Sequence, residues 1–85
     1  MNPAIMVTPE SIQTHIAQGL ACSFLQVEGD GQHFNAIIVS ESFAGLSRIK
    51  QHQLVYQLLG DRMRVEIHAL SLQTFTPDAW AAAAR

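Results

Sequence analysis

The sequence contains a single cysteine, Cys22, and no long apolar run. One cysteine cannot form an internal disulfide, and zinc sites built from paired cysteines are excluded with it. The longest apolar runs, such as residues 36–39, are far shorter than the roughly 20 residues of a membrane span. The first residues also lack the basic and apolar segments of a secretion signal. These absences predict a protein of the reducing cytoplasm.

Charged residues are scarce as well, at 14% of the chain, and the formal net charge is −2 at pH 7. Nucleic-acid binding depends largely on positive charges that displace counterions from phosphates. Positive charges cluster only at Arg48 with Lys50 and at Arg62 with Arg64. The composition therefore excludes a general attraction to a phosphate backbone and leaves only a local basic patch to provide one.

Motifs of catalysis are also missing. The sequence has no nucleophile–base motif, no Walker loop and no dinucleotide-binding fingerprint. The serines at positions 40, 42 and 47 are explained by a strand end and by helix caps. We therefore expect a protein that is not an enzyme.

Apolar residues, in contrast, make up 48% of the 85 positions, enough for one domain with a single core. Capping residues followed by proline, at Thr8-Pro9 and Thr76-Pro77, predict the starts of two helices, and Ser47 can cap a third. Between them lie β-prone runs, the first two separated by a glycine-containing loop. The predicted elements are a helix over residues 9–19, strands over 22–28 and 33–40, a helix from 47 to about 60 or 63, a strand over 65–72 and a short helix from 76.

This order, α-β-β-α-β-α, predicts an α+β fold with a three-stranded mixed sheet covered by helices. The second strand is apolar on both sides and should be central. The third strand should run parallel to the second, because a helix connects them. For the long helix, the residues expected on or near its apolar face are Ile49, Val55, Tyr56, Leu59 and Met63.

Three separated stretches, residues 34–47, 51–58 and 67–80, together resemble the hallmark segments of BolA-like proteins. The hairpin over residues 27–34 most resembles the bacterial IbaG branch of that family. The resemblance implies a fold like the type II KH domain, in agreement with the element order. Many family members carry an arginine where this chain has Gln51, immediately before His52.

The resemblance also implies a partner and a cofactor: a monothiol glutaredoxin and a 2Fe-2S cluster that the two proteins share, in cluster trafficking, iron homeostasis or a stress response. It assigns His68 and His33 as the ligands from this chain. An iron-sulfur cluster needs four ligands, so a glutaredoxin cysteine and a bound glutathione would supply the other two. From the residues alone, the simpler interpretation of His33 is an exposed loop histidine, and that of His68 is a histidine of the core with a hydrogen-bond partner.

The remaining histidines and the cysteine have simpler interpretations. His52 falls within the apolar stripe of the long helix, where a hydrogen bond to the sheet would give it a structural role. His15 has an exposed helical position and is interpreted as a surface residue. Cys22 begins a strand with no cation nearby in sequence, so we expect a buried, unreactive thiol.

Two alternatives to the cluster hypothesis stay open at the level of sequence. The KH-like fold, and BolA relatives described as transcription regulators, suggest nucleic-acid binding, although the Gly-x-x-Gly loop of ordinary KH domains is absent. A purely structural or chaperone-like role is the other alternative. Dimerisation of the isolated protein is a further possibility that the sequence does not decide.

Overall fold

The computed structural model describes residues 8–30, 33–66 and 69–83. Its elements follow the predicted order and confirm the α+β fold. In chain order they are α1 (Pro9–Gly19), β1 (Phe24–Gly29), β2 (His33–Val39), the 3-10 turn η1 (Glu41–Phe43), α2 (Arg48–Glu66), β3 (Ala69–Phe75) and α3 (Pro77–Ala83).

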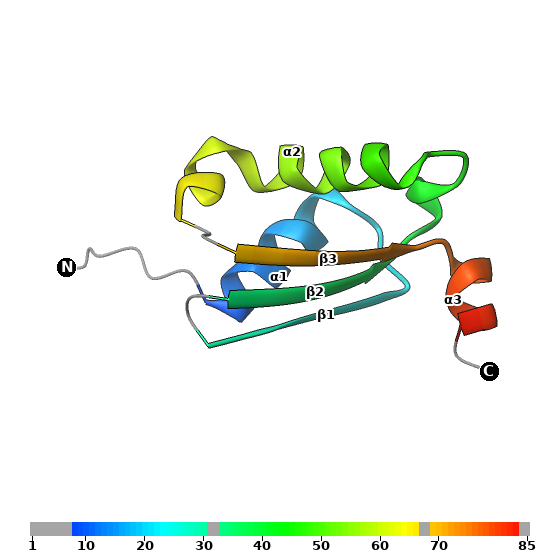
Figure 1. Cartoon of the computed structure of the whole chain (residues 1–85), viewed down its shortest axis with the longest axis horizontal. Coiled ribbons are helices and arrows are strands. Elements are labelled where there is room, and N and C mark those ends of the chain that lie inside the picture. The colour runs from blue at the N-terminus through cyan, green and yellow to red at the C-terminus, as the bar shows by residue number, and fades with distance from the viewer. Residues whose placement is uncertain (1–7, 31–32, 67–68, 84–85) are drawn as a thin grey trace.

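The described strands form one mixed sheet in the order β1-β2-β3. β1 pairs with β2 in the antiparallel direction, and β2 pairs with β3 in the parallel direction. The central position of β2 and the parallel pairing of β3 are therefore confirmed. Figure 1 shows α2 running alongside the sheet together with α1, and α3 at the end of the strands near the C-terminus.

The helix starts are built by the predicted capping residues. Thr8 accepts a hydrogen bond from the Ser11 backbone N–H at 3.0 Å, and the Ser11 side chain accepts one from the Thr8 N–H at 3.0 Å. This reciprocal pair satisfies N–H groups that the first turn of a helix leaves unpaired. Ser47 and Thr76 likewise accept from Lys50 and Ala79, at 3.2 Å each.

The core lies between one face of the sheet and the helices α1 and α2. Side chains alternate along a strand, so Phe34, Ala36 and Ile38 of β2 point to the same face. All three are buried there against Ile12 and Ile16 of α1. Burial of this apolar surface is the main contribution to the stability of the fold.

The boundary between α2 and β3 differs from the prediction. Val65 and Glu66, expected to begin the third strand, are helical, and β3 extends from Ala69 to Phe75 rather than ending at residue 72. The helical conformation is interrupted at Gly60, whose φ of 77° is accessible to glycine at little cost. After this break residues 61–66 resume a helix, since a run containing arginine, methionine and glutamate favours helix over strand.

The apolar face predicted for α2 is also corrected in part. Val55 and Leu59 are buried, but Ile49 is 71% exposed and Tyr56 lies at the surface. Ile49 and Tyr56 are seven residues apart, about two helical turns, so they lie on the same side of α2, rotated by roughly 60–120° about the helix axis from the buried pair. Met63 lies among the residues whose side chains are not described.

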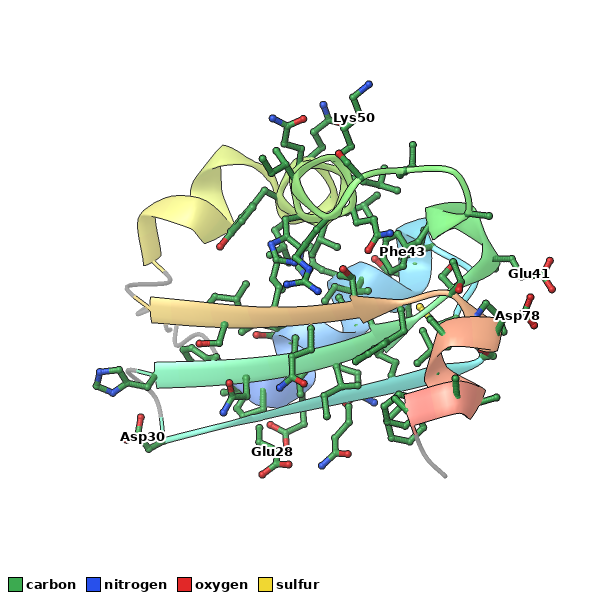
Figure 2. All side chains as sticks on the ribbon, turned by 45° about the vertical axis from the view of Figure 1, so that its right-hand side comes forward. Glu28, Asp30, Glu41, Phe43, Lys50 and Asp78 are labelled. Carbon is green, nitrogen blue, oxygen red and sulfur yellow. The ribbon has the colours of Figure 1, made fainter. Side chains whose placement is uncertain are left out.

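Among the described residues, the second face of the sheet is covered at one end, where α3 packs. Trp80 of α3 stacks on Phe24 with ring centroids 5.2 Å apart and meets Phe75 at the same distance with tilted rings. The predicted sheet covered by helices is confirmed, with α1 and α2 on one face and α3 at one end of the other. We call the second face the open face. In Figure 2, Asp30 lies at one end of the sheet and Asp78 of α3 at the other.

Within the described part of the chain, no helix has the length and apolar character that crossing a bilayer requires.

Candidate functional site

His33 is the first residue of β2 and lies at the end of the sheet farthest from Trp80 along that strand. The parallel register pairs it with Ala69, the residue that follows His68 in the sequence. His68 itself lies outside the described residues, so its predicted role as a ligand is neither placed nor contradicted. The register does show that the segment beginning directly after His68 is the neighbour of His33.

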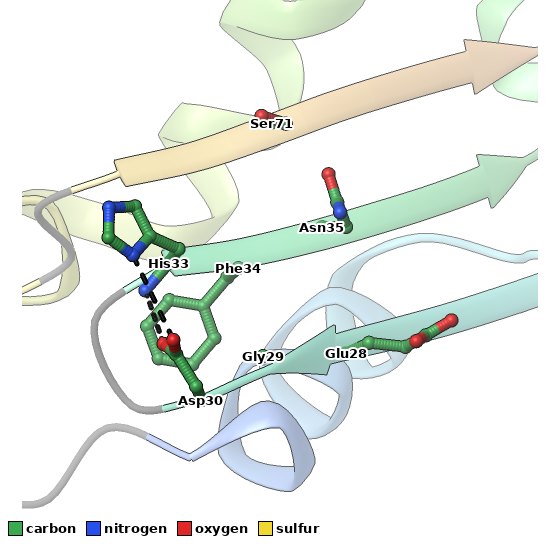
Figure 3. A pocket seen from close by; sticks show the side chains of 7 residues that line it. All are labelled: Glu28, Gly29, Asp30, His33, Phe34, Asn35 and Ser71. Atoms are coloured by element: carbon green, nitrogen blue, oxygen red, sulfur yellow. Dashed lines mark hydrogen bonds and ion pairs between the residues drawn. The ribbon is translucent and has the colours of Figure 1, made fainter.

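On the open face, each row of paired residues differs from the next in polarity and exposure. The row nearest His33 contains Glu28, Asn35 and Ser71, all exposed. Together with Gly29, Asp30, His33 and Phe34 these residues line a shallow, open pocket of about 420 Å³. Figure 3 shows this pocket between the ends of the strands, with the imidazole of His33 beside the carboxylate of Asp30.

One backbone–backbone hydrogen bond, one backbone–side-chain hydrogen bond and one contact between side chains link Asp30 to His33. The Asp30 N–H donates to the His33 carbonyl at 3.2 Å, and the His33 N–H donates to Asp30 Oδ1 at 2.9 Å. The second carboxylate oxygen, Oδ2, lies 3.9 Å from His33 Nδ1. The hairpin loop therefore places a carboxylate beside one nitrogen of this imidazole.

The close turn also depends on Gly29. A Cβ at that position would lie 2.5 Å from Phe34 Cδ1 and 2.6 Å from the His33 carbonyl oxygen. Both distances are far below normal van der Waals contact, so a larger residue would push the start of β2 away. The glycine therefore allows the hairpin to close tightly next to His33.

The His33 imidazole meets the basic requirements of a metal ligand. Its side chain is 76% exposed, and among the described residues only Asp30 contacts a ring nitrogen, at Nδ1. Nε2 therefore faces no competing donor from the described part of the chain. Within that part, no three His, Cys, Asp or Glu side chains converge as a metal site needs. His33 thus fits a site whose other ligands come from outside these residues.

The other two histidines differ from His33 in position. His15 is exposed, as predicted, and its Nδ1 lies 3.0 Å from the Ser11 carbonyl oxygen within α1. His52 is half-buried, and its Nε2 is shielded from solvent without a hydrogen-bond partner in the described structure. The hydrogen bond that we expected from His52 to the sheet is therefore not formed. Neither histidine lies in the pocket of His33.

Gln51, the neighbour of His52, forms the hydrogen bond between helix and sheet that was expected of the histidine. Its amide nitrogen donates to the carbonyl oxygens of Leu46 and Phe43 at 3.0 and 3.3 Å, and its oxygen accepts from the Thr74 hydroxyl. One side chain thus joins α2, the segment before it and β3. Sequence reasoning noted Gln51 only as a departure from arginine, because nothing local indicates that its amide reaches Thr74.

Cys22 is half-buried and packs against the core, two residues before β1 begins. Burial raises the pKa of its thiol, because the apolar surroundings disfavour the thiolate. Its Sγ donates to the Leu20 carbonyl at 3.5 Å. A protonated thiol is a poor metal ligand and a poor nucleophile, in agreement with the expectation of an unreactive cysteine.

Comparison with known proteins gives a consistent result. Residues 3–79 match the family described as "BolA-like protein". The acid stress protein IbaG of Escherichia coli K12 is 41% identical over 71 residues, which cover 82% of this chain and 84% of IbaG. The DNA-binding transcriptional regulator BolA of Haemophilus influenzae is 43% identical over 54 residues, 64% of this chain and about half (52%) of that protein.

Among solved structures, the bolA protein homologue from Coxiella burnetii superposes with a TM-score of 0.77 and 44% identity, covering 89% of this chain and 99% of the homologue. The two curated relatives are named for stress and for regulation, and neither name describes a catalysed reaction.

Proposed function

This chain belongs to the BolA-like protein family, and we propose that it shares a 2Fe-2S cluster with a monothiol glutaredoxin, using His33 and His68 as its ligands. The family assignment confirms the resemblance read from the sequence, including its likeness to the bacterial IbaG branch. The proposed role is non-catalytic and cytoplasmic: cluster trafficking or iron homeostasis under stress.

The observation that carries the proposal is the placement of His33. An imidazole at the mouth of a pocket, exposed on one side and beside a carboxylate on the other, has the arrangement that protein metal ligands commonly have. A histidine held only for folding would be expected to have its ring packed or hydrogen-bonded within the structure. His33 has no packing of that kind, since it is mostly exposed.

The pairing of His33 with Ala69 supports the second ligand. Consecutive residues are joined by a fixed covalent geometry, so a ligand at position 68 would come from the chain that enters β3 beside His33. Two histidines cannot complete a four-ligand site. The cysteine of the glutaredoxin and the thiol of glutathione are the two ligands that we propose from the partner side.

Two neutral imidazoles in place of two thiolates give a 2Fe-2S cluster a higher reduction potential than thiolates alone. In this proposal the chain itself contributes the two imidazoles. Because a protonated imidazole has no lone pair for iron, acid must compete with the cluster for His33 and His68. The name of the E. coli relative, acid stress protein, is compatible with such a response.

The test is to mix the purified protein with a monothiol glutaredoxin, glutathione, iron and sulfide, and to record visible absorption and circular dichroism. We expect a coloured heterodimer. His68→Ala should abolish it and His33→Ala should weaken or alter it, because a ligand in a loop-flanking position is replaced more easily by water or another donor. His15→Ala and His52→Ala are matched controls that remove an imidazole outside the pocket. Identical spectra for all four variants would refute the ligand assignment.

Nucleic-acid binding is the second candidate, and the name of the H. influenzae relative is what favours it. In this chain, Arg48 and Lys50 are exposed in the first turn of α2, where they form a small basic patch. Such a patch would give salt-dependent binding. DNA binding below micromolar at physiological salt that Arg48→Ala weakens and His33→Ala leaves unchanged would favour this function over the cluster.

A further inference from the structure

We propose that Asp30 is a positioning residue for His33. The Asp30 carboxylate favours the imidazole proton on Nδ1 and so leaves the lone pair of Nε2 for iron. This inference rests on the proposed function, because it names the ligating atom of the same site. It concerns the second carboxylate oxygen of Asp30, Oδ2, which lies 3.9 Å from His33 Nδ1.

The two carboxylate oxygens of Asp30 make different contacts with His33. Oδ1 accepts the backbone N–H of His33 at 2.9 Å, a distance typical of a hydrogen bond to a charged acceptor. That bond fixes the carboxylate relative to the His33 backbone. Oδ2 is thereby held on the Nδ1 side of the ring, 3.9 Å away (Figure 3). The turn and the contact with the ring are therefore two consequences of one side-chain orientation.

An ionised carboxylate can only accept hydrogen bonds, so it favours a proton on the ring nitrogen that faces it. A lone pair on Nδ1 would point toward a negative charge, whereas an N–H there is attracted to it. Free histidine side chains in water favour the proton on Nε2. Asp30 therefore shifts the imidazole toward the form in which Nε2 carries the lone pair.

The distance of 3.9 Å is longer than a hydrogen bond, and Asp30 is 72% exposed, so the bias in the isolated protein is modest. The preference for a proton on Nδ1 should increase once Nε2 binds a metal, because coordination makes the opposite N–H a stronger donor. A carboxylate partner in turn raises the basicity of the ligating imidazole. Ligation through Nδ1 would instead require the Asp30 side chain to move away and break its bond to the backbone.

Glu28 provides a control within the same pocket. Its carboxylate accepts a hydrogen bond from Gln26 and points away from the His33 ring (Figure 3). Glu28→Gln removes one negative charge from the pocket without touching the contact with Nδ1. Asp30→Asn removes the same charge but keeps an oxygen that can accept the His33 backbone N–H. The two variants therefore differ in the contact and not in the charge that is lost.

The first measurement uses the isolated protein. Long-range ¹H–¹⁵N correlation spectra, at one fixed pH where imidazoles are neutral, report which nitrogen of His33 carries the proton. We expect the ratio of Nδ1–H to Nε2–H to be higher in wild type and in Glu28→Gln than in Asp30→Asn, by up to about fivefold, the range of exposed ion pairs. The same ratio in Asp30→Asn as in wild type, or an equal fall in Glu28→Gln, would overturn the proposal.

The second measurement uses the glutaredoxin heterodimer. In Asp30→Asn, the chelator concentration that removes half of the iron from the heterodimer should be about tenfold lower or more, because loss of the partner of a ligating histidine weakens metal binding by that much. Glu28→Gln should match wild type. If wild type forms no coloured heterodimer, the proposed function fails, while the spectra of the isolated protein still decide whether Asp30 controls the His33 ring. If the heterodimer forms and Asp30→Asn is as resistant as wild type, the positioning role fails alone.

Discussion

The two ends of the open face are built from the same three strands and differ in almost every other respect. At one end Phe24, Val39 and Phe75 form a paired row, and Trp80 packs against both phenylalanine rings. Val39 has no exposed surface there. At the other end, His33 and the row beside it are exposed. One end therefore contributes packing, and the other presents side chains that can react.

The difference shows why the exposed side chains of the candidate site can vary at little cost to the fold. Side chains at the His33 end contribute little buried apolar area, so their chemistry is free to be set by a partner or a ligand. Side chains at the Trp80 end are constrained by contact with one another. Substitutions at the two ends should therefore separate effects on stability from effects on the site.

The largest expected loss of stability follows from Trp80→Ala. Truncating a fully buried tryptophan costs roughly 3–5 kcal/mol. Trp80 is half-buried, so we expect about 2–3 kcal/mol in the free energy of unfolding, measured by urea denaturation with circular dichroism. Trp80→Phe should recover much of the loss, and Asp78→Asn on the same helix is the control. An unchanged denaturation midpoint for Trp80→Ala would show that α3 contributes nothing to the packed end.

A smaller loss is expected from Gln51→Ala, at the same end of the sheet but on its covered face. The change removes the hydrogen bonds to Leu46, Phe43 and Thr74 and should cost about 1–2 kcal/mol, measured in the same way. Gln51→Arg should lose less, because arginine can still donate to both carbonyls although it cannot accept from Thr74. Gln53→Ala, an exposed change on the same helix, is the control. Equal stability of Gln51→Ala and wild type would show that the network is not stabilising.

At the opposite end, His33→Ala should change the free energy of unfolding by less than about 0.5 kcal/mol, as exposed substitutions usually do. The same variant is expected to weaken the shared cluster. Thermal melts and heterodimer spectra on one protein sample measure both effects. A stability loss above about 1 kcal/mol would contradict the contrast between the two ends, since it would make His33 part of the packed structure.

The sequence predicted the fold wherever a local rule dominates. Thr8 and Thr76 cap helices as expected, and the apolar pattern identified β2 as central. The start of β3 was misplaced because the β-branched Val65 favours a strand, whereas α2 continues to Glu66. The exposure of Ile49 was missed because the residues that α2 packs against are distant in sequence.

The candidate site was predictable only in part, and that part came from family resemblance and not from local rules. Resemblance to a family pointed to His33 and His68, but no periodicity in the chain distinguishes a ligand from a surface histidine. The contact between Asp30 and His33 spans three residues and could have been suspected from the turn, since aspartate often caps the backbone of a tight loop. The register that pairs His33 with Ala69 could not have been predicted, because it joins residues that α2 separates in the sequence.

The smallest expected effect concerns Cys22, which precedes β1 at the packed end and contrasts with the exposed His33. Burial raises the pKa of its thiol above the ordinary value of 9.0, so the folded state holds this proton more tightly than the unfolded state. Below that pH both states are protonated and the contribution to stability is fully present. As pH rises through 9.0 and toward the folded-state pKa, the unfolded thiol ionises first, and the contribution is lost.

The free energy of unfolding of wild type should therefore fall relative to Cys22→Ser as pH is raised from 7 to 10. Serine is the matched control because it keeps a donor for the Leu20 carbonyl and does not titrate in this range. Other groups titrate at alkaline pH in both proteins, so the difference between the two curves isolates the thiol. Alkylation of native Cys22 by iodoacetamide at pH 8 should also be slower than that of the unfolded chain, because less of the thiol is ionised. Parallel stability curves together with equal alkylation rates would mean that the packed end does not shield this thiol, and the contrast between Cys22 and His33 as ligands would lose its physical basis.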